Sequence, residues 1–408
     1  MALERRTHAW LHLFALTAVH FVIDLAPGVM HAVLPAFQDH FAWRINLAGR
    51  MFGAVAAGGW LLGIYNLTCN GVQVLTGHWR AENDRPVFQQ IGLALCMSIC
   101  LAALLPQSQL SYLLMVGLAL LGGVGVGIVH PEAMRAIHAL DCISPSVSTG
   151  FYMAGGVGGF AVGSVLAPVL VRSYGLAGLY AFFILPIGAI LLITPLRLRL
   201  ARDQDPPQAP PTVAKNHPCV SPFRQIMALT TLAGITSAVL TWILPQRLYA
   251  HEMGGLAVMM YMLGGGVGAF VLGCLAHRWG EIRTAVVAIG SSLPLLFLAI
   301  MHIERTWALF LLFVVGFLGF GAYPLMISLA RRAPGPGLGR RMGLIIGGVW
   351  GLACLSQMVL GPVADHFGPH VVLRLTPAGF AAAWLLGLYM WRSEHRAVHA
   401  LAVEGLAQ

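Results

Sequence analysis

A polar segment in the middle of an otherwise apolar chain is the feature that most constrains the fold. Residues 197–222 read RLRLARDQDPPQAPPTVAKNHPCVSP and contain six prolines. On either side of this segment lie long apolar runs separated by short polar turns. A hydrophilic linker between two similar apolar halves is typical of a two-bundle membrane transporter.

The composition indicates that the chain is embedded in a membrane. Hydrophobic residues make up 58% of the chain and charged residues 10%, whereas about a quarter of the residues in an average soluble domain are charged. A helix needs about 20 apolar residues to cross a bilayer. Windows of that length lie near residues 10–37, 47–76, 87–105, 111–139, 147–171, 176–196, 223–248, 255–276, 284–303, 306–330, 342–364 and 370–391.

These windows predict an all-α integral membrane protein with twelve transmembrane helices in two six-helix bundles. The predicted domains are an N-terminal bundle over residues 1–196, a cytoplasmic proline-rich linker over 197–222 and a C-terminal bundle with a short cytoplasmic tail over 223–408.

The distribution of positive charge predicts the orientation. If the amino terminus is inside, 18 of the 24 Lys and Arg residues fall in cytoplasmic segments, and only six fall outside: Arg44, Arg50, Arg172, Arg247, Arg305 and Arg374. The positive-inside rule therefore places both termini and the linker in the cytoplasm. Since topology accounts for the net charge of +9, we expect no nucleic-acid partner.

Glycine-rich stretches recur in the two halves. Residues 155–163 read GGVGGFAVG and residues 265–273 read GGVGAFVLG. Small residues let helix backbones approach closely in lipid. Tight packing alone is one interpretation. The other is that smooth helix surfaces between the halves let one bundle rock against the other, a gating role for Gly155, Gly156, Gly265 and Gly266.

Asp24 is the strongest single functional signal, because it lies midway along the first predicted helix. A carboxylate near the bilayer centre costs about 2.5–3.5 kcal/mol on insertion scales, so it normally faces a cavity and has a function. His20 lies one helical turn earlier on the same face. The pair predicts proton coupling or substrate contact, and the alternative is a buried pair that only ties helices together.

A second group of polar residues lies at the cytoplasmic end of the fourth predicted helix. His130 precedes Pro131 and Glu132, and Arg135 follows three residues later. Glu132 and Arg135 are spaced to pair with each other. The group predicts a gate or proton relay at the cytoplasmic mouth, with His130 and Arg135 as gating residues and Glu132 in the proton path, or else an ordinary helix-end ion pair.

Further polar side chains within the predicted helices are candidates for substrate binding. Each of them could equally serve only as packing or hydrogen-bonding contacts between helices. The candidates are Arg50, Asn66, Asn70, Gln73, Thr241, Tyr323 and Gln357.

The sequence contains no motif that would make the chain an enzyme or an ATP-driven pump. No phosphate loop, nucleophile elbow or nucleotide-binding segment is present, so we expect no cofactor and an ion or substrate gradient as the energy source. Sixteen histidines and seventeen methionines suggest metal transport, but the sequence spacing shows no carboxylate–histidine cage. We therefore predict no metal site.

The chain resembles the major facilitator superfamily, and within it the fosmidomycin-resistance type of efflux transporter. The resemblance extends over essentially all twelve predicted helices. Its most specific motifs are the His-x-x-x-Asp of His20 and Asp24, the later Pro35, and the His-Pro-Glu of residues 130–132 after a glycine run. The resemblance implies export of a small organic compound in exchange for protons.

The superfamily's loop pattern, Gly-x-x-x-Asp-(Arg/Lys)-x-Gly, is altered here. After the eighth helix His277 occupies the Asp position and is followed by Arg278, a predicted gating residue; after the second helix Ala81 occupies it. In the family those aspartates latch the outward-open state. The intact pattern, with Asp365, occurs over residues 361–368 on the opposite side of the membrane.

These observations favour a proton-coupled transporter of the bacterial inner membrane that works by alternating access and exports a small organic compound or drug. Its expected partners are the substrate, protons and lipid, and the expected state is a monomer. Two alternatives stay open. One is a proton-coupled importer of a nutrient, metal ion or metal chelate, and the other is a non-transporting sensor or assembly factor on a transporter scaffold.

Overall fold

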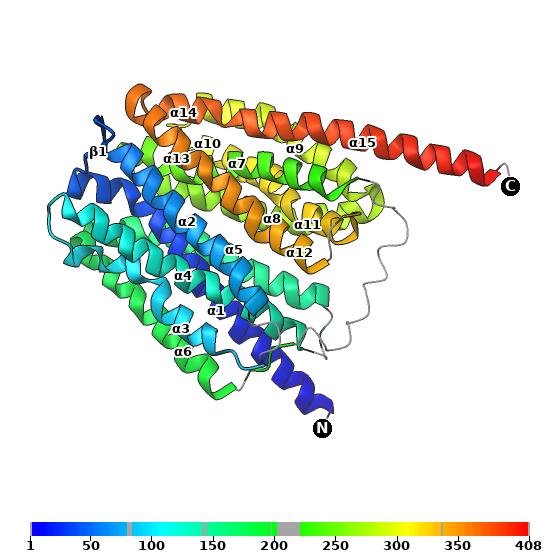
Figure 1. Cartoon of the computed structure of the whole chain (residues 1–408), viewed down its shortest axis with the longest axis horizontal. Coiled ribbons are helices and arrows are strands. Elements are labelled where there is room, and N and C mark those ends of the chain that lie inside the picture. The colour runs from blue at the N-terminus through cyan, green and yellow to red at the C-terminus, as the bar shows by residue number, and fades with distance from the viewer. Residues whose placement is uncertain are drawn as a thin grey trace.

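The computed structural model describes residues 2–79, 84–140, 143, 145–196, 198–201, 221–335 and 338–406. Most of the predicted linker, at 197 and 202–220, lies outside this part of the chain, as does Ala81. The described residues form long helices that run side by side (Figure 1). The predicted all-α class is therefore confirmed.

The described residues of the first half form six α-helices and one small hairpin. In chain order its elements are α1 (Ala2–Phe41), β1 (Ile45–Leu47), β2 (Arg50–Phe52), α2 (Ala54–Trp79), α3 (Val87–Cys96), η1 (Ser98–Leu104), α4 (Leu110–His138), α5 (Pro145–Tyr174), η2 (Gly175–Phe183), α6 (Ile184–Ile193) and η3 (Thr194–Leu196).

The second half repeats the pattern of long helices with short connections. Its elements are α7 (Phe223–Arg247), η5 (Tyr249–His251), α8 (Gly254–Trp279), α9 (Glu281–Met301), α10 (Ala308–Gly319), η6 (Phe320–Ala322), α11 (Tyr323–Arg332), α12 (Leu338–Gly343), the π-helical η7 (Leu344–Gly348), α13 (Val349–Phe367), α14 (Pro369–Leu375) and α15 (Pro377–Leu406).

Ten helical stretches of the described residues are long and apolar enough to cross a membrane. One of them, Val147–Leu196, contains two of the predicted windows, which are separated where Gly175 adopts a φ of +64°. The α2 helix is not among the ten, in keeping with its polar side chains Asn66, Asn70 and Gln73. The stretches otherwise follow the predicted windows.

The predicted start of the second helix at residue 47 is wrong. Residues 45–52 instead form a two-stranded antiparallel hairpin in which Ile45 pairs with Phe52 and Leu47 with Arg50. Its turn residues Ala48 and Gly49 have φ angles of +50° and +79°, which is the left-handed pair of a tight hairpin turn. The helix begins only after this turn, at Ala54.

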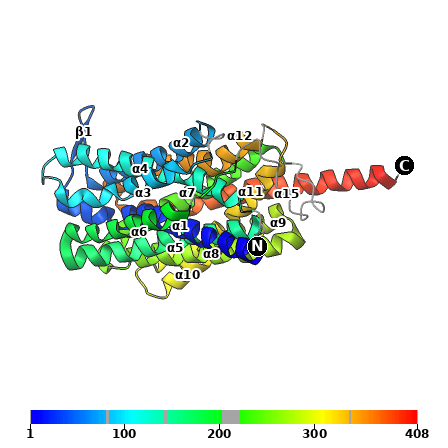
Figure 2. The same ribbon diagram turned by 90° about the horizontal axis from the view of Figure 1, so that it is seen from below.

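The bundle has two ends. The short connections at 42–53, 105–109, 248–253, 302–307 and 368 lie at the end with the β1–β2 hairpin, here called the hairpin end. The chain termini and the connections next to the linker lie at the opposite end, the linker end, where α15 extends beyond the other helices (Figure 2).

Glycines let helices within each half pack backbone to backbone. In the first half, a Cβ added at Gly159 of α5 would lie under 3.0 Å from the backbone oxygen of Phe21 in α1. In the second half, a Cβ at Gly264 of α8 would lie equally close to the backbone oxygen of Phe313 in α10. Any larger residue at these positions would force the paired helices apart.

We expect Gly264→Ala to destabilise the protein by about 1–3 kcal/mol, the usual cost of overpacking a tight contact. The matched control is Gly273→Ala on the same helix, because a Cβ at Gly273 has no atom within 4 Å. The measurement is thermal unfolding of the purified variants in detergent. Equal midpoints for the two variants would contradict the packing account.

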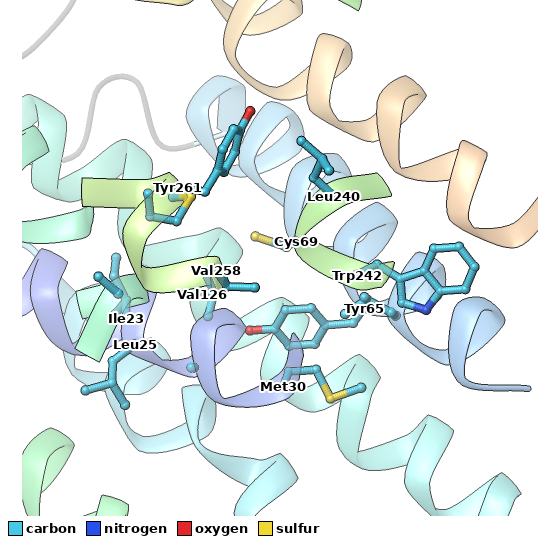
Figure 3. Close-up of a cluster of buried hydrophobic side chains, with 14 of the residues drawn as sticks. Ile23, Leu25, Met30, Tyr65, Cys69, Val126, Leu240, Trp242, Val258 and Tyr261 are labelled. Carbon is cyan, nitrogen blue, oxygen red and sulfur yellow. The ribbon is translucent and has the colours of Figure 1, made fainter. Parts of the chain in front are cut away.

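The two halves meet in an apolar layer. Figure 3 shows Tyr65, Met30 and Val126 of the first half facing Leu240, Trp242 and Val258 of the second half. All six side chains are buried. These side chains pack the two halves against each other.

Candidate functional site

Three titratable side chains meet inside the first half of the protein. One carboxylate oxygen of Asp24, Oδ2, lies 3.1 Å from His20 Nε2, and the other, Oδ1, lies 3.1 Å from His130 Nε2. We call these three residues the Asp24 triad. The predicted pairing of His20 with Asp24 on one helical face is confirmed, whereas the presence of His130 from α4 was not predicted.

The fold fixes both histidine rings through their other nitrogen. His20 Nδ1 lies 2.6 Å from the backbone oxygen of Tyr152 in α5, and His130 Nδ1 lies 3.0 Å from that of Val126, one turn earlier in α4. A carbonyl oxygen only accepts hydrogen bonds, so each Nδ1 must hold a hydrogen and donate it. Each Nε2 is therefore the atom that can gain or lose a proton.

Counting the protons on the Nε2 atoms gives the triad two states in which at least one contact at Asp24 is a hydrogen bond. A contact between Nε2 and a carboxylate oxygen is a hydrogen bond only when one proton lies between them. Both contacts at Asp24 are therefore hydrogen bonds when the triad holds two protons, for a net charge of +1. When one proton leaves, the triad is neutral and one contact loses its hydrogen.

The triad is partly open. The side chain of His20 is only 3% exposed, but those of Asp24 and His130 are 24% and 19% exposed. Since nearly all of His20 is enclosed, Asp24 and His130 are the members of the triad that can be reached from outside it. Ionisable groups inside a membrane protein are costly and normally pair with one another or face a cavity.

Two residues of α5 complete the walls of the triad. The ring of Tyr152 stacks on that of His20 with their centroids 3.8 Å apart, and its hydroxyl has no hydrogen-bond partner among the described residues. Gly156 lies against the triad directly, because a Cβ there would approach Asp24 Oδ2 and the His20 ring to under 3.0 Å. Tyr152 was not predicted from the sequence, because it contributes only its backbone oxygen and the face of its ring.

The same atoms could hold a metal ion. One ligand atom from each residue of the triad lies within 4.8 Å of the others, and two histidines with one carboxylate are a common ligand set for transition metals. The expectation that the chain has no carboxylate–histidine cluster is therefore wrong. Sequence spacing could not show it because His130 joins from a separate helix.

Glu132 and Arg135 each hydrogen-bond to backbone groups of the first half. Glu132 is 2% exposed, and its Oε2 accepts backbone hydrogen bonds from Phe88 at 2.9 Å and Gln89 at 3.2 Å. These N–H groups belong to the first turn of α3, so Glu132 caps that helix. Arg135 Nε donates to the backbone oxygen of Ala201 at 2.8 Å, which attaches residues 198–201 to the linker end.

The predicted substrate-binding residues fall into separate regions. Asn66 Nδ2 lies 3.4 Å from Gln357 Oε1 across the two halves, and Gln357 Nε2 donates to the backbone oxygen of Ala238 at 2.8 Å. Asn70 and Thr241 hydrogen-bond to backbone oxygens of their own helices. These contacts make them part of the helix packing in this state.

Gln73, Arg50 and Tyr323 have different surroundings. Gln73 Nε2 lies 3.5 Å from Cys69 Sγ on the same helix. Arg50 is exposed in β2 at the hairpin end, outside the helix in which it was expected. Tyr323 lines a cavity of about 20 Å³ in the second half, together with Phe320 and Trp350. The cavity is small, with room for about one water molecule.

Only one of the four predicted gating glycines lies between the halves. A Cβ at Gly266 would lie 3.0 Å from Val157 of the other half. Gly155 and Gly156 instead face α1 within the first half, and Gly265 faces Phe320 within the second. Their expected position between the halves is wrong, because α5 and α8 use these glycines to approach neighbours in their own bundle.

Arg278 and His277 are exposed at the end of α8, on the linker side. Arg278 is thus placed at the surface of the end where gating was predicted. Asp365, the remaining member of the loop pattern, lies at the opposite end of the bundle, the hairpin end.

Comparisons with known proteins agree with this architecture. A model of the Major Facilitator Superfamily matches residues 144–354. The "Fosmidomycin resistance protein" of Escherichia coli (strain K12) is 20% identical over 375 residues, which cover 88% of each chain. An uncharacterized MFS-type transporter, YfnC, of Bacillus subtilis (strain 168) is 20% identical over 369 residues, covering 87% of this chain and 86% of its own.

Solved structures show the same fold at low sequence identity. A partially occluded inward-open xylose transporter, XylE, from E. coli superimposes with a TM-score of 0.67 at 12% identity, covering 95% of this chain and 98% of its own. A POT family transporter in complex with a thioalcohol-conjugated peptide also has a TM-score of 0.67 at 12% identity, covering 94% and 96%.

Proposed function

Because the chain belongs to the Major Facilitator Superfamily, we propose that it is a proton-coupled antiporter that works by alternating access. It exports a small organic compound or drug from the cytoplasm in exchange for protons. The observation that supports this proposal is the Asp24 triad, in which a carboxylate inside the bundle touches two histidines and two of the three side chains are partly open.

The triad supplies a way to couple two fluxes. In its two-proton state the net charge is +1, and in its one-proton state it is neutral. Removing a charge from a site of low dielectric changes the electrostatic energy of the surrounding helices. Alternation between the halves would then depend on which state the triad holds, and the substrate would bias the same equilibrium from its own site.

Export and location are supported by other observations than the triad. Export is supported by the distant similarity to a fosmidomycin resistance protein. A bacterial inner (cytoplasmic) membrane is supported by the bacterial sources of the two similar proteins. The charge asymmetry of the loops supports an orientation with both termini and the linker end in the cytoplasm. We propose that the substrate binds where the halves separate, beside the small cavity of the second half that Phe320, Tyr323 and Trp350 help to line. Its flat aromatic walls suit a substrate with a planar or apolar part.

Membrane vesicles of known orientation test the proposal. Everted vesicles from cells that overproduce the protein are energised to be acidic inside, and uptake of fosmidomycin and of a panel of labelled antibacterials is measured. We expect uptake that a protonophore abolishes. Uptake into right-side-out vesicles alone would show an importer, and no flux in either orientation would favour a non-transporting sensor.

A metal ion is the second candidate cargo, because the three ligand atoms of the triad lie within 4.8 Å of one another. The same vesicles loaded with a zinc-sensitive dye distinguish the two. Protonophore-sensitive zinc flux without flux of any organic compound would replace the first proposal with the second.

A further inference from the structure

A carboxylate of the second half caps a helix of the first half at the hairpin end. Asp365 lies near the end of α13, and α2 begins at Ala54. Its Oδ2 accepts a hydrogen bond from the backbone N–H of Gly53, and its Oδ1 accepts one from Val55 at 3.2 Å. The first N–H groups of a helix have no partner inside that helix, so Asp365 supplies what α2 itself lacks.

Charge makes this contact stronger than an ordinary hydrogen bond. A carboxylate at the positive end of a helix dipole is stabilised by the dipole as well as by the N–H groups it accepts from. Asp365, Gly53 and Val55 are all partly buried, which limits screening by solvent. The ion pair of Arg172 with Glu252, at 2.7 Å, also joins the two halves, but its side chains are 44% and 66% exposed.

Glycines on both sides of this contact let α2 and α13 approach each other closely. A Cβ at Gly53 would lie 2.8 and 2.9 Å from the two carboxylate oxygens of Asp365, so any side chain there would displace the carboxylate. One turn earlier in α13, a Cβ at Gly361 would lie 3.1 Å from Cα of Ala56 in α2. A glycine just before α2 and another in α13 therefore let the carboxylate reach the N–H groups.

Other contacts between the same helices continue inward from this point. Trp60 Nε1 donates to the backbone oxygen of Met358 at 3.0 Å, and a Cβ at Gly59 would lie 2.8 Å from the backbone oxygen of Gln357. Opening the hairpin end would separate α2 from α13 and break the Asp365 contact first. The N–H groups of Gly53 and Val55 would then need water in place of the carboxylate.

We propose that Asp365 with the N–H groups of Gly53 and Val55 forms a latch that holds the hairpin end closed and sets the resting state of the protein. The resting state is therefore open toward the linker end or closed at both ends. At the linker end, the equivalent position in the chain is occupied by an exposed histidine, His277. The latch builds on the proposed alternating access but not on proton coupling or on any substrate.

Distance measurements between spin labels test the latch without transport. One label replaces Gln107 of the first half and the other Arg305 of the second, both exposed at the hairpin end, in a cysteine-free background reconstituted into liposomes. Pulsed electron paramagnetic resonance then gives the populations with the hairpin end closed and open. We expect the closed population to dominate in the parent protein.

Two variants break the latch in different ways. Asp365→Ala removes both acceptor oxygens, and Gly53→Ala pushes the carboxylate away while keeping it. Each is expected to raise the ratio of open to closed populations about tenfold, as loss of a charge-assisted hydrogen bond predicts. Arg172→Gln, which breaks the exposed ion pair, should change the ratio only about twofold.

The outcomes separate this inference from the proposed function. Unchanged distances in folded Asp365→Ala and Gly53→Ala would overturn the latch, and so would a change as large in Arg172→Gln. A shift in both latch variants in a protein that moves no protons would support the latch and reject the coupling. Size-exclusion profiles identify any variant that fails to fold, and the other latch variant then decides.

Discussion

Asp24→Asn is expected to abolish proton-driven transport while the protein still folds and still exchanges substrate across the membrane. Asparagine has nearly the same shape as aspartate and can contact both histidines, but it has no negative charge and only one acceptor oxygen. With two protons on the Nε2 atoms the site would then have a net charge of +2, so the triad loses its two-proton state. Substrate exchange needs no net proton movement, so it should continue.

Two assays on the same proteoliposomes measure this difference. The first follows substrate accumulation driven by an imposed pH gradient, which should fall to the level of empty liposomes in Asp24→Asn. The second follows counterflow of labelled against unlabelled substrate, which should persist. Asp39→Asn is the matched control, because Asp39 lies on the same helix but is exposed at the hairpin end. If gradient-driven accumulation survives in Asp24→Asn, Asp24 has a structural role only.

Gly156→Ala is expected to lower the rate of transport about 10- to 100-fold, the loss that a displacement of about 1 Å causes in a site with strict geometry. The added methyl group would approach Asp24 Oδ2 and the His20 ring to under 3.0 Å. Either the carboxylate or the ring must move, and at least one of the two 3.1 Å contacts at Asp24 is lost.

Gly158→Ala is the control for this prediction. It is the same substitution two residues later on α5, but its methyl group would meet only the Phe21 ring, at 3.7 Å or more, an ordinary packing distance. Initial rates of proton-driven transport are measured for both variants at equal amounts of folded protein. A loss of rate that is the same in both would mean that helix packing, and not the geometry of the triad, limits transport.

Much of the fold could be predicted because a membrane imposes a length and a composition on each helix. The predicted windows match the apolar stretches of the described residues, and the main exception has a local cause. Residues 45–52 form a hairpin whose turn depends on the left-handed residues Ala48 and Gly49. An apolarity window does not detect that conformation, so the helix was predicted to begin too early.

The site was predictable only where its residues are close in the sequence. His20 and Asp24 are one turn apart, so helical geometry alone places them together. His130 lies on α4, and nothing in its spacing indicates that α4 brings it to Asp24. The capping contacts of Glu132 and Asp365 were hidden for another reason, since their partners are backbone N–H groups. Every residue except proline has such a group, so the sequence does not mark the partner.

The central claim is that substrate movement is coupled to protons through the Asp24 triad. The most direct test uses liposomes that contain the purified protein and a trapped pH dye, with no imposed pH gradient and a gradient of a transported compound. The account predicts that the internal pH changes when the compound is added to the wild-type protein and does not change with Asp24→Asn. Substrate movement without a pH change in the wild type, or an equal pH change in the variant, would contradict it.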